Sequence, residues 1–140
     1  MKSSMECYVF RLLPGTDLLQ SLKDFLIKED ITAGCILSCA GSLKPSVLRL
    51  SDHRKGTRYD FPAEIVSLSG TVSTEGCHLH MSVADEEGRV IGGHVLPGSM
   101  VYTTAEIIIG ELPKLNFTRQ PCSLSGYNEL VVTKKPTERS

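Results

Sequence analysis

Short strand-forming segments fill the chain from about residue 35 onward, and no helical segment separates them. Gly, Pro, Ser and Asp punctuate these runs, a pattern typical of strands joined by turns. Parallel neighbours need a long crossover connection, usually a helix, whereas antiparallel neighbours can be joined by hairpins. The sequence therefore predicts an antiparallel sheet built from residues 35–43, 46–51, 64–73, 77–84, 89–95, 101–112 and 127–135.

A single main helix is expected before these segments. Residues 5–15 are rich in strand formers and stop at Pro14-Gly15. Asp17 can then cap a helix, with Gln20 as the reciprocal partner of a capping box, and residues 28–30 end it. The apolar face at helical spacing consists of Leu18, Leu22, Phe25 and Leu26. The predicted fold class is α+β: a central curved antiparallel sheet or open barrel, with one main helix packed on its apolar side.

Length and composition fit one globular domain. The chain has 140 residues, of which 41% are hydrophobic and 22% charged. We assign residues 1–133 to the domain and residues 134–140, with the sequence KKPTERS, to a polar C-terminal tail. The formal net charge of -1 argues against a protein whose whole surface serves to bind phosphates.

The cysteines and the N-terminal residues predict a reducing compartment. The chain has five cysteines and no Cys-x-x-Cys motif, which favours free thiols, with Cys35 and Cys39 as small buried hydrophobes. No long apolar run precedes the first proline, and no segment approaches the length of about 20 apolar residues that spans a bilayer. We therefore expect a cytoplasmic protein, or a nuclear one in a eukaryote, that does not bind membranes.

The segment GCHLHMSVADEEGRVIGGHV, residues 76–95, predicts a β-hairpin with a defined register. Glu86-Glu87-Gly88 suits a three-residue loop in which a type I turn is followed by a left-handed glycine. That loop places Asp85 opposite Arg89, Ala84 opposite Val90, and His80 opposite His94.

Three of the four histidines then lie on one face of the hairpin, because strand residues two apart point to the same side. They are His78, His80 and His94, and Cys77 points to the other face. The opposite face is consistently apolar and consists of Leu79, Met81, Val83, Ile91 and Val95. A slip of one residue in the pairing would mix the two faces.

Three imidazoles with Cβ atoms roughly 5 to 7 Å apart can converge on one cation. Zinc accepts such nitrogen ligands and commonly keeps a fourth position for water or a ligand, and another divalent metal fits the same residues. Gly92 and Gly93 beside His94 leave room for a ligand or a close backbone. The sequence thus predicts His78, His80 and His94 as metal ligands; a polar surface without metal is the alternative reading.

Three other titratable residues have two readings each. His53 lies in a polar loop with Arg54, Lys55 and Arg58, which is either a solvated loop or a phosphate contact. Glu64 and Glu106 lie within apolar strands. Each is either a carboxylate on the surface or a group with a role at the metal: it would orient a ligand histidine, or act as a general base beside a metal-bound water.

Several motifs together resemble the PPC domain, the plants-and-prokaryotes conserved domain. They are LLPGTDLLQSL, AGSLKPSVLRL, EIVSLSGTVS, HLHMSVADEEGRVIGGHV and TTAEIIIGEL followed by SGYNELVV, and the resemblance runs from about residue 6 to residue 133. The resemblance implies an α+β domain that assembles as a homotrimer. It also implies a metal ion, with zinc as the first choice, on His78, His80 and His94. The stretch that begins at Glu64 resembles a segment that family members use in association.

Two classes of function follow. The first is a metal-binding homotrimer that takes a small-molecule ligand; whether it is an enzyme stays open, because the sequence identifies no catalytic base. The second is a regulatory module that associates with itself and with protein partners and has a DNA-binding role. Plant members join the domain to AT-hooks with an Arg-Gly-Arg core, and no Arg-Gly-Arg occurs in this chain, which weighs against DNA.

Overall fold

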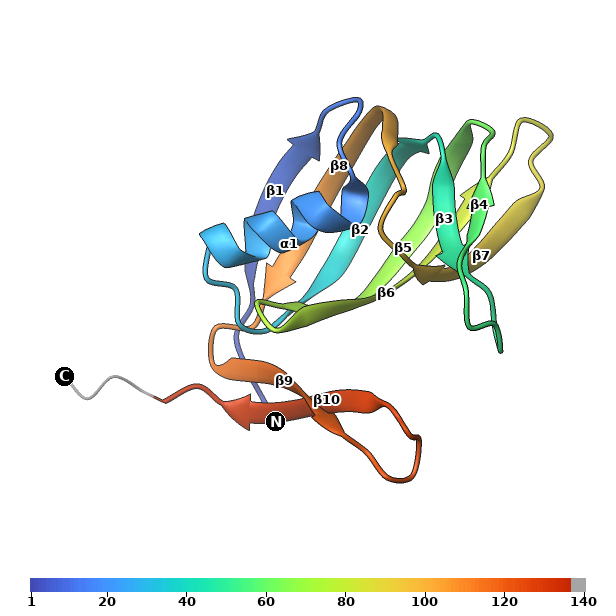
Figure 1. Ribbon diagram of the computed structural model, residues 1–140. Coiled ribbons are helices and arrows are strands. Elements are labelled where there is room, and N and C mark those ends of the chain that lie inside the picture. Colours follow the sequence, from blue (N-terminus) through green and yellow to red (C-terminus); the bar gives the residue numbers. More distant parts are fainter. Residues whose placement is uncertain (137–140) are drawn as a thin grey trace.

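The computed structural model describes residues 1–136 and confirms the α+β class. One helix, α1 (Leu18–Lys28), lies across one face of a curved sheet at the end formed by β1, β8 and β2 (Figure 1). Within the described residues, eight strands form this main sheet, and two more form a separate hairpin. The eight are β1 (Glu6–Leu12), β2 (Gly34–Leu43), β3 (Ser46–Arg49), β4 (Thr57–Tyr59), β5 (Ala63–Ser73), β6 (Gly76–Ala84), β7 (Val90–Val95) and β8 (Val101–Glu111).

Every strand pairing among the described residues is antiparallel, as the succession of strands without helices predicted. The order in the main sheet is β1-β8-β2-β5-β6-β7-β3-β4. Bulges interrupt the register between Ile36 and Ser38 in β2 and between Ile65 and Ser67 in β5. Bulges bend the strand that carries them, which accounts for part of the curvature.

The arm, defined here as the hairpin of β9 (Leu115–Pro121) and β10 (Asn128–Lys134), projects from the main sheet in Figure 1. The sequence reading predicted β10 but missed β9 and the three-residue β4. Lys134 pairs with Leu115, so β10 reaches one residue into the segment assigned to the C-terminal tail. Residues 137–140 of that tail lie outside the described part of the chain.

Helix α1 begins where the capping pattern predicted. Asp17 Oδ1 accepts a hydrogen bond of 3.0 Å from the backbone N–H of Gln20, and such a cap stabilises a helix by about 1 kcal/mol. The reciprocal half of the capping box was wrong. The Gln20 amide instead donates to Asp24 Oδ1, four residues along the same helix, at 2.9 Å.

The main core lies between α1 and the concave face of the sheet. Leu18, Leu22 and Leu26 of the helix are fully buried there, while Phe25 is partly buried and stacks on Phe10. The other face of the sheet carries the polar side chains of β5, β6 and β7, including the histidines. Because the core face fixes the register, the polar face is fixed as well.

Candidate metal centre

The β6–β7 hairpin has the register that the sequence predicted. His80 lies opposite His94, and Ala84 lies opposite Val90. Gly88 closes the loop with φ 77, and its N–H donates to Asp85 O at 3.0 Å. A left-handed residue at this position is what the three-residue hairpin loop requires.

The two faces of the hairpin separate as expected. Leu79, Met81, Val83 and Val95 are buried in the core, and Ile91 is partly buried against it. Cys77 also packs against the core, which removes its thiol from the histidine face. His78 and His80 are exposed and His94 is half-buried, all on the outer face.

The three imidazoles converge. One ring nitrogen from each of His78, His80 and His94 lies within 4.8 Å of the others, and the Nε2 atoms of His78 and His80 are 3.3 Å apart. Nitrogens bound about 2.0 to 2.1 Å from a tetrahedral zinc ion lie about 3.3 to 3.4 Å from each other. Two of the three ligand atoms therefore already have the separation that tetrahedral coordination needs, and the third lies within 4.8 Å of them.

His94 adds a second observation. Its Nδ1 is buried and has no hydrogen-bond partner among the described residues. Buried ring nitrogens normally have a partner, so an orphaned one inside a histidine cluster fits a site that is completed by another species. The residues present thus fit a divalent metal in number, type and spacing.

The surroundings favour the neutral, metal-binding form of two of the rings. Burial lowers the pKa of His78, and the neighbouring His80 and Arg119 lower it further. Burial also lowers the pKa of His94, with Arg49 as the next cause. Imidazole binds metal through a lone pair that protonation removes, so a lowered pKa keeps these nitrogens available at neutral pH.

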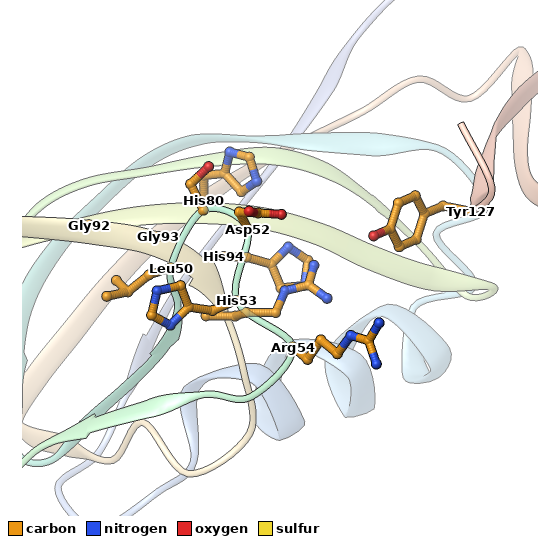
Figure 2. Close-up of a pocket in the computed structure, with 11 residues that line it drawn as sticks. Leu50, Asp52, His53, Arg54, His80, Gly92, Gly93, His94 and Tyr127 are labelled. Carbon is orange, nitrogen blue, oxygen red and sulfur yellow. The ribbon is translucent and has the colours of Figure 1, made fainter. Parts of the chain in front are cut away.

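A pocket of about 680 Å³ opens beside His80 and His94. Figure 2 shows Leu50, Asp52, His53 and Arg54 of the β3–β4 loop around it, together with Gly92 and Gly93 of β7. Tyr127, from the loop of the arm, points toward the histidines from the other side. A volume of this size suits a small molecule.

The close approach of the strands below this pocket depends on glycine. A Cβ on Gly93 would lie 2.7 Å from the backbone oxygen of Arg49 on the neighbouring strand β3. This agrees with the prediction that the glycine pair permits a close backbone, and it lets Arg49 sit directly opposite His94 in the register.

The β3–β4 loop and the arm meet at the histidines, which the amino-acid sequence alone does not indicate. His53 is exposed, as a solvated loop residue would be, yet it lines the pocket. A second pocket of about 310 Å³ lies against His78 and His94 and is lined by Arg49, Cys77, Arg119, Tyr127, Asn128 and Glu129. No short-range pattern links positions so far apart in the chain.

Glu64 and Glu106 match the surface reading. Both are exposed, and Glu106 lies opposite Ala40 and Arg11, on the strands at the other end of the sheet. Glu64 lies opposite Ala84, close to the hairpin turn rather than to the histidines. Neither carboxylate makes a hydrogen bond to His78, His80 or His94 among the described residues.

The five cysteines are free thiols. Cys35 and Cys39 are half-buried rather than fully buried, which corrects the expectation that both are core residues. Burial raises the pKa of Cys39 to about 11.

Among residues 1–136, no helix has the length and apolar character that crossing a bilayer would require.

Comparison with known sequences identifies the family to which this architecture corresponds. A model of the Plants and Prokaryotes Conserved (PCC) domain matches residues 1–113. The bifunctional protein GlmU of Synechococcus sp. (strain JA-3-3Ab) is 44% identical over 131 residues, which make up 94% of this chain and 21% of that protein. This chain therefore spans about a fifth of the length of that relative.

Solved structures share the fold over nearly the full chain. A hypothetical protein from Salmonella cholerae-suis is 40% identical and superposes with a TM-score of 0.96, covering 97% of this chain and 99% of that one. A metal-containing protein from Archaeoglobus fulgidus is 26% identical, with a TM-score of 0.81 and coverage of 93% and 95%.

Proposed function

The chain belongs to the Plants and Prokaryotes Conserved domain family (PCC, also written PPC), and on that premise we propose that it is a metal-binding protein whose ligands are His78, His80 and His94. The observation that carries the proposal is the convergence of three ring nitrogens within 4.8 Å, on a hairpin whose register is fixed by its core face. The metal-containing relative from Archaeoglobus fulgidus supports it.

Zinc is the metal that fits this ligand set best. Three histidine nitrogens without a protein carboxylate or thiolate are typical of zinc sites that keep a fourth position open. Bound there, zinc would act as a Lewis acid toward an oxygen ligand. The chain itself supplies the hairpin, the three imidazole rings and the adjoining pocket.

Elemental analysis of the purified protein tests the metal. We expect about one zinc ion for each chain, lost on chelation and regained on addition of zinc. His80→Ala should abolish retention, because two histidines hold zinc much more weakly than three. His53→Ala is the matched control: it removes an imidazole that lines the same pocket but lies outside the histidine cluster. Unchanged zinc content in His80→Ala would refute the proposed site.

We also propose that the protein assembles as a homotrimer. Several large apolar side chains on the strands are exposed, among them Val9 at 74%, Val66 at 57% and Tyr102 at 48%. Val66 lies in the stretch from Glu64 that resembles an association segment of the family. Contact with further copies of the chain would cover these side chains.

Light scattering coupled to size-exclusion chromatography measures the assembly directly. A mass three times the 15.3 kDa of one chain is expected. Val66→Glu should reduce that mass, because it places a charge on the apolar surface, whereas Glu86→Gln in the solvated hairpin loop should leave it unchanged. A monomeric wild-type protein would exclude the trimer.

A further inference from the structure

We infer that the metal site binds a small molecule that carries an oxyanion group, a carboxylate or a phosphate, and that Arg49 and Arg119 hold this group beside the metal. The inference rests on the proposed metal site and names the chemistry of its ligand. It is drawn from two guanidinium groups that flank the histidines from two different elements.

Arg49 stands next to His94. It lies at the end of β3, directly opposite His94 in the register, and it lines both pockets beside the histidines. Its side chain belongs to a half-buried residue, and no ion pair to it is found among the described residues. A guanidinium that is partly withdrawn from water without a carboxylate favours an anionic partner from outside the chain.

Arg119 approaches from the arm. Its Nη2 donates to Thr71 Oγ1 at 2.9 Å, and Thr71 lies directly opposite His78 on the neighbouring strand β5. This hydrogen bond holds the guanidinium over the histidine face, in the pocket of about 310 Å³ that also contains His78 and His94. Arg119 therefore keeps further N–H groups for a ligand, since a guanidinium has five donors.

The charge balance of the two pockets favours an anion once the metal is present. Among the described residues that line the smaller pocket, Arg49 and Arg119 face one carboxylate, that of Glu129. In the larger pocket, the described lining places Arg49 and Arg54 against one carboxylate, that of Asp52. A divalent ion on three neutral histidines adds two positive charges. An oxyanion beside such a metal would be attracted by its charge, and Arg49 and Arg119 would donate hydrogen bonds to the oxygens of that group.

Part of this recognition comes from the arm, which follows the residues that the family model matches. The family model matches residues 1–113, whereas Arg119, Tyr127 and Glu129 all come from the segment that follows. The exposed ring of Tyr127 borders both pockets, where it can pack on the body of a small molecule. The histidines thus come from the family core, and the residues that select the ligand come partly from the arm.

Cobalt-substituted protein provides the test, because the visible absorption of tetrahedral Co²⁺ changes when a ligand enters its coordination sphere. The probes are acetate, inorganic phosphate and, as a neutral control, acetamide. The variants are Arg49→Gln and Arg119→Gln, and the matched control is Arg58→Gln, whose guanidinium binds Asp60 at 2.7 Å and lines neither pocket. Metal content is measured for every sample.

We expect acetate or phosphate to change the spectrum and acetamide not to; the anion that binds identifies the group. Arg49→Gln should weaken that binding by about 10- to 100-fold, as expected for a hydrogen bond to a charged group, while Arg58→Gln leaves it unchanged. Equal anion affinity in Arg49→Gln, Arg119→Gln and wild type would overturn the inference, as would no response to either anion. So would loss of cobalt from both variants, since the arginines would then be structural.

The outcomes separate this inference from the proposal on which it rests. If wild-type protein retains cobalt but neither anion binds through the arginines, the oxyanion site alone is wrong. If wild-type protein retains no metal at all, the metal site is wrong, and the inference is overturned with it.

Discussion

His80 and His94 lie directly opposite each other on β6 and β7, with ring centroids 5.8 Å apart. This pairing results from a loop of three residues and a core face that allows no other register. The chemistry of the site therefore depends on the hairpin turn, although the turn itself contacts no histidine.

Replacing Gly88 with alanine should destabilise the hairpin. Gly88 has φ 77, and a residue with a Cβ loses roughly 1–2 kcal/mol in this left-handed region. Open space surrounds the Cβ position, so the cost is one of backbone conformation and not of collision. Urea unfolding of Gly88→Ala and of the loop control Glu86→Ala measures the difference; equal stability of Gly88→Ala and wild type would contradict the assigned turn.

Asp85→Asn should lower stability at neutral pH. Asp85 Oδ1 accepts hydrogen bonds from the backbone N–H groups of Glu87 at 3.0 Å and Arg89 at 2.8 Å, and Arg89 Nε donates to Oδ2 at 2.8 Å. Burial alone would raise the pKa of Asp85, but these bonds hold it below its ordinary value.

The same residue gives that prediction a pH dependence with a defined sign. A depressed carboxyl pKa stabilises the fold above the unfolded-state pKa, and this contribution is lost as the pH falls through the lower, folded-state value. The stability gap between wild type and Asp85→Asn should thus be present at pH 7 and shrink below about pH 4. Unfolding curves of both proteins at several pH values measure this difference in stability. A difference that grows as the pH falls would contradict a lowered pKa for Asp85 in the folded protein.

Zinc should raise the thermal stability of the protein. A ligand that binds only the folded state adds about 2.7 kcal/mol at one hundred times its dissociation constant, which corresponds to several degrees in a domain of this size. Differential scanning calorimetry with zinc and with a chelator measures the shift. His80→Ala should show little of it, and an equal zinc-induced shift in that variant would place the binding elsewhere.

Duplex DNA should bind weakly. The net charge is -1, and within the densest basic segment Arg58 is paired with Asp60 while Arg54 lines the pocket beside the histidines. Within this segment Lys55 is then the cation left for the phosphate contacts that dominate DNA affinity. A fluorescence titration at physiological salt checks this expectation, and salt-sensitive micromolar binding would instead support the DNA-binding alternative.

The fold and the histidine cluster were predictable for the same reason. Both depend on local patterns, namely alternation of polar and apolar residues and the glycine of one turn, and such patterns determine which face a side chain occupies. The capping of α1 by Asp17 was predictable on the same basis, whereas the Gln20 side chain had two polar partners within reach and took Asp24.

The missed features depend on contacts between distant segments. β4 has only three residues, and its sequence TRY has no apolar alternation. The alternation of Leu115 and Phe117 with polar residues indicates a strand at β9. No local pattern indicates that Arg119 donates to Thr71 or that Tyr127 lines the pockets beside the histidines. The placement of His53 at the pocket likewise results from the return of β3 beside β7.

The arm packs against the rest of the molecule through a separate apolar cluster. Ala33, Leu115 and Phe117 form this cluster, with Leu112 and Val132 at its edge, apart from the core beneath α1. Sequence changes at the arm's tip can therefore reshape the entrance to the histidines while the sheet that bears them keeps its stability. Because the arm and the sheet have separate apolar clusters, related chains can change the small molecule that they bind through substitutions in the arm, while the histidine-bearing sheet stays the same.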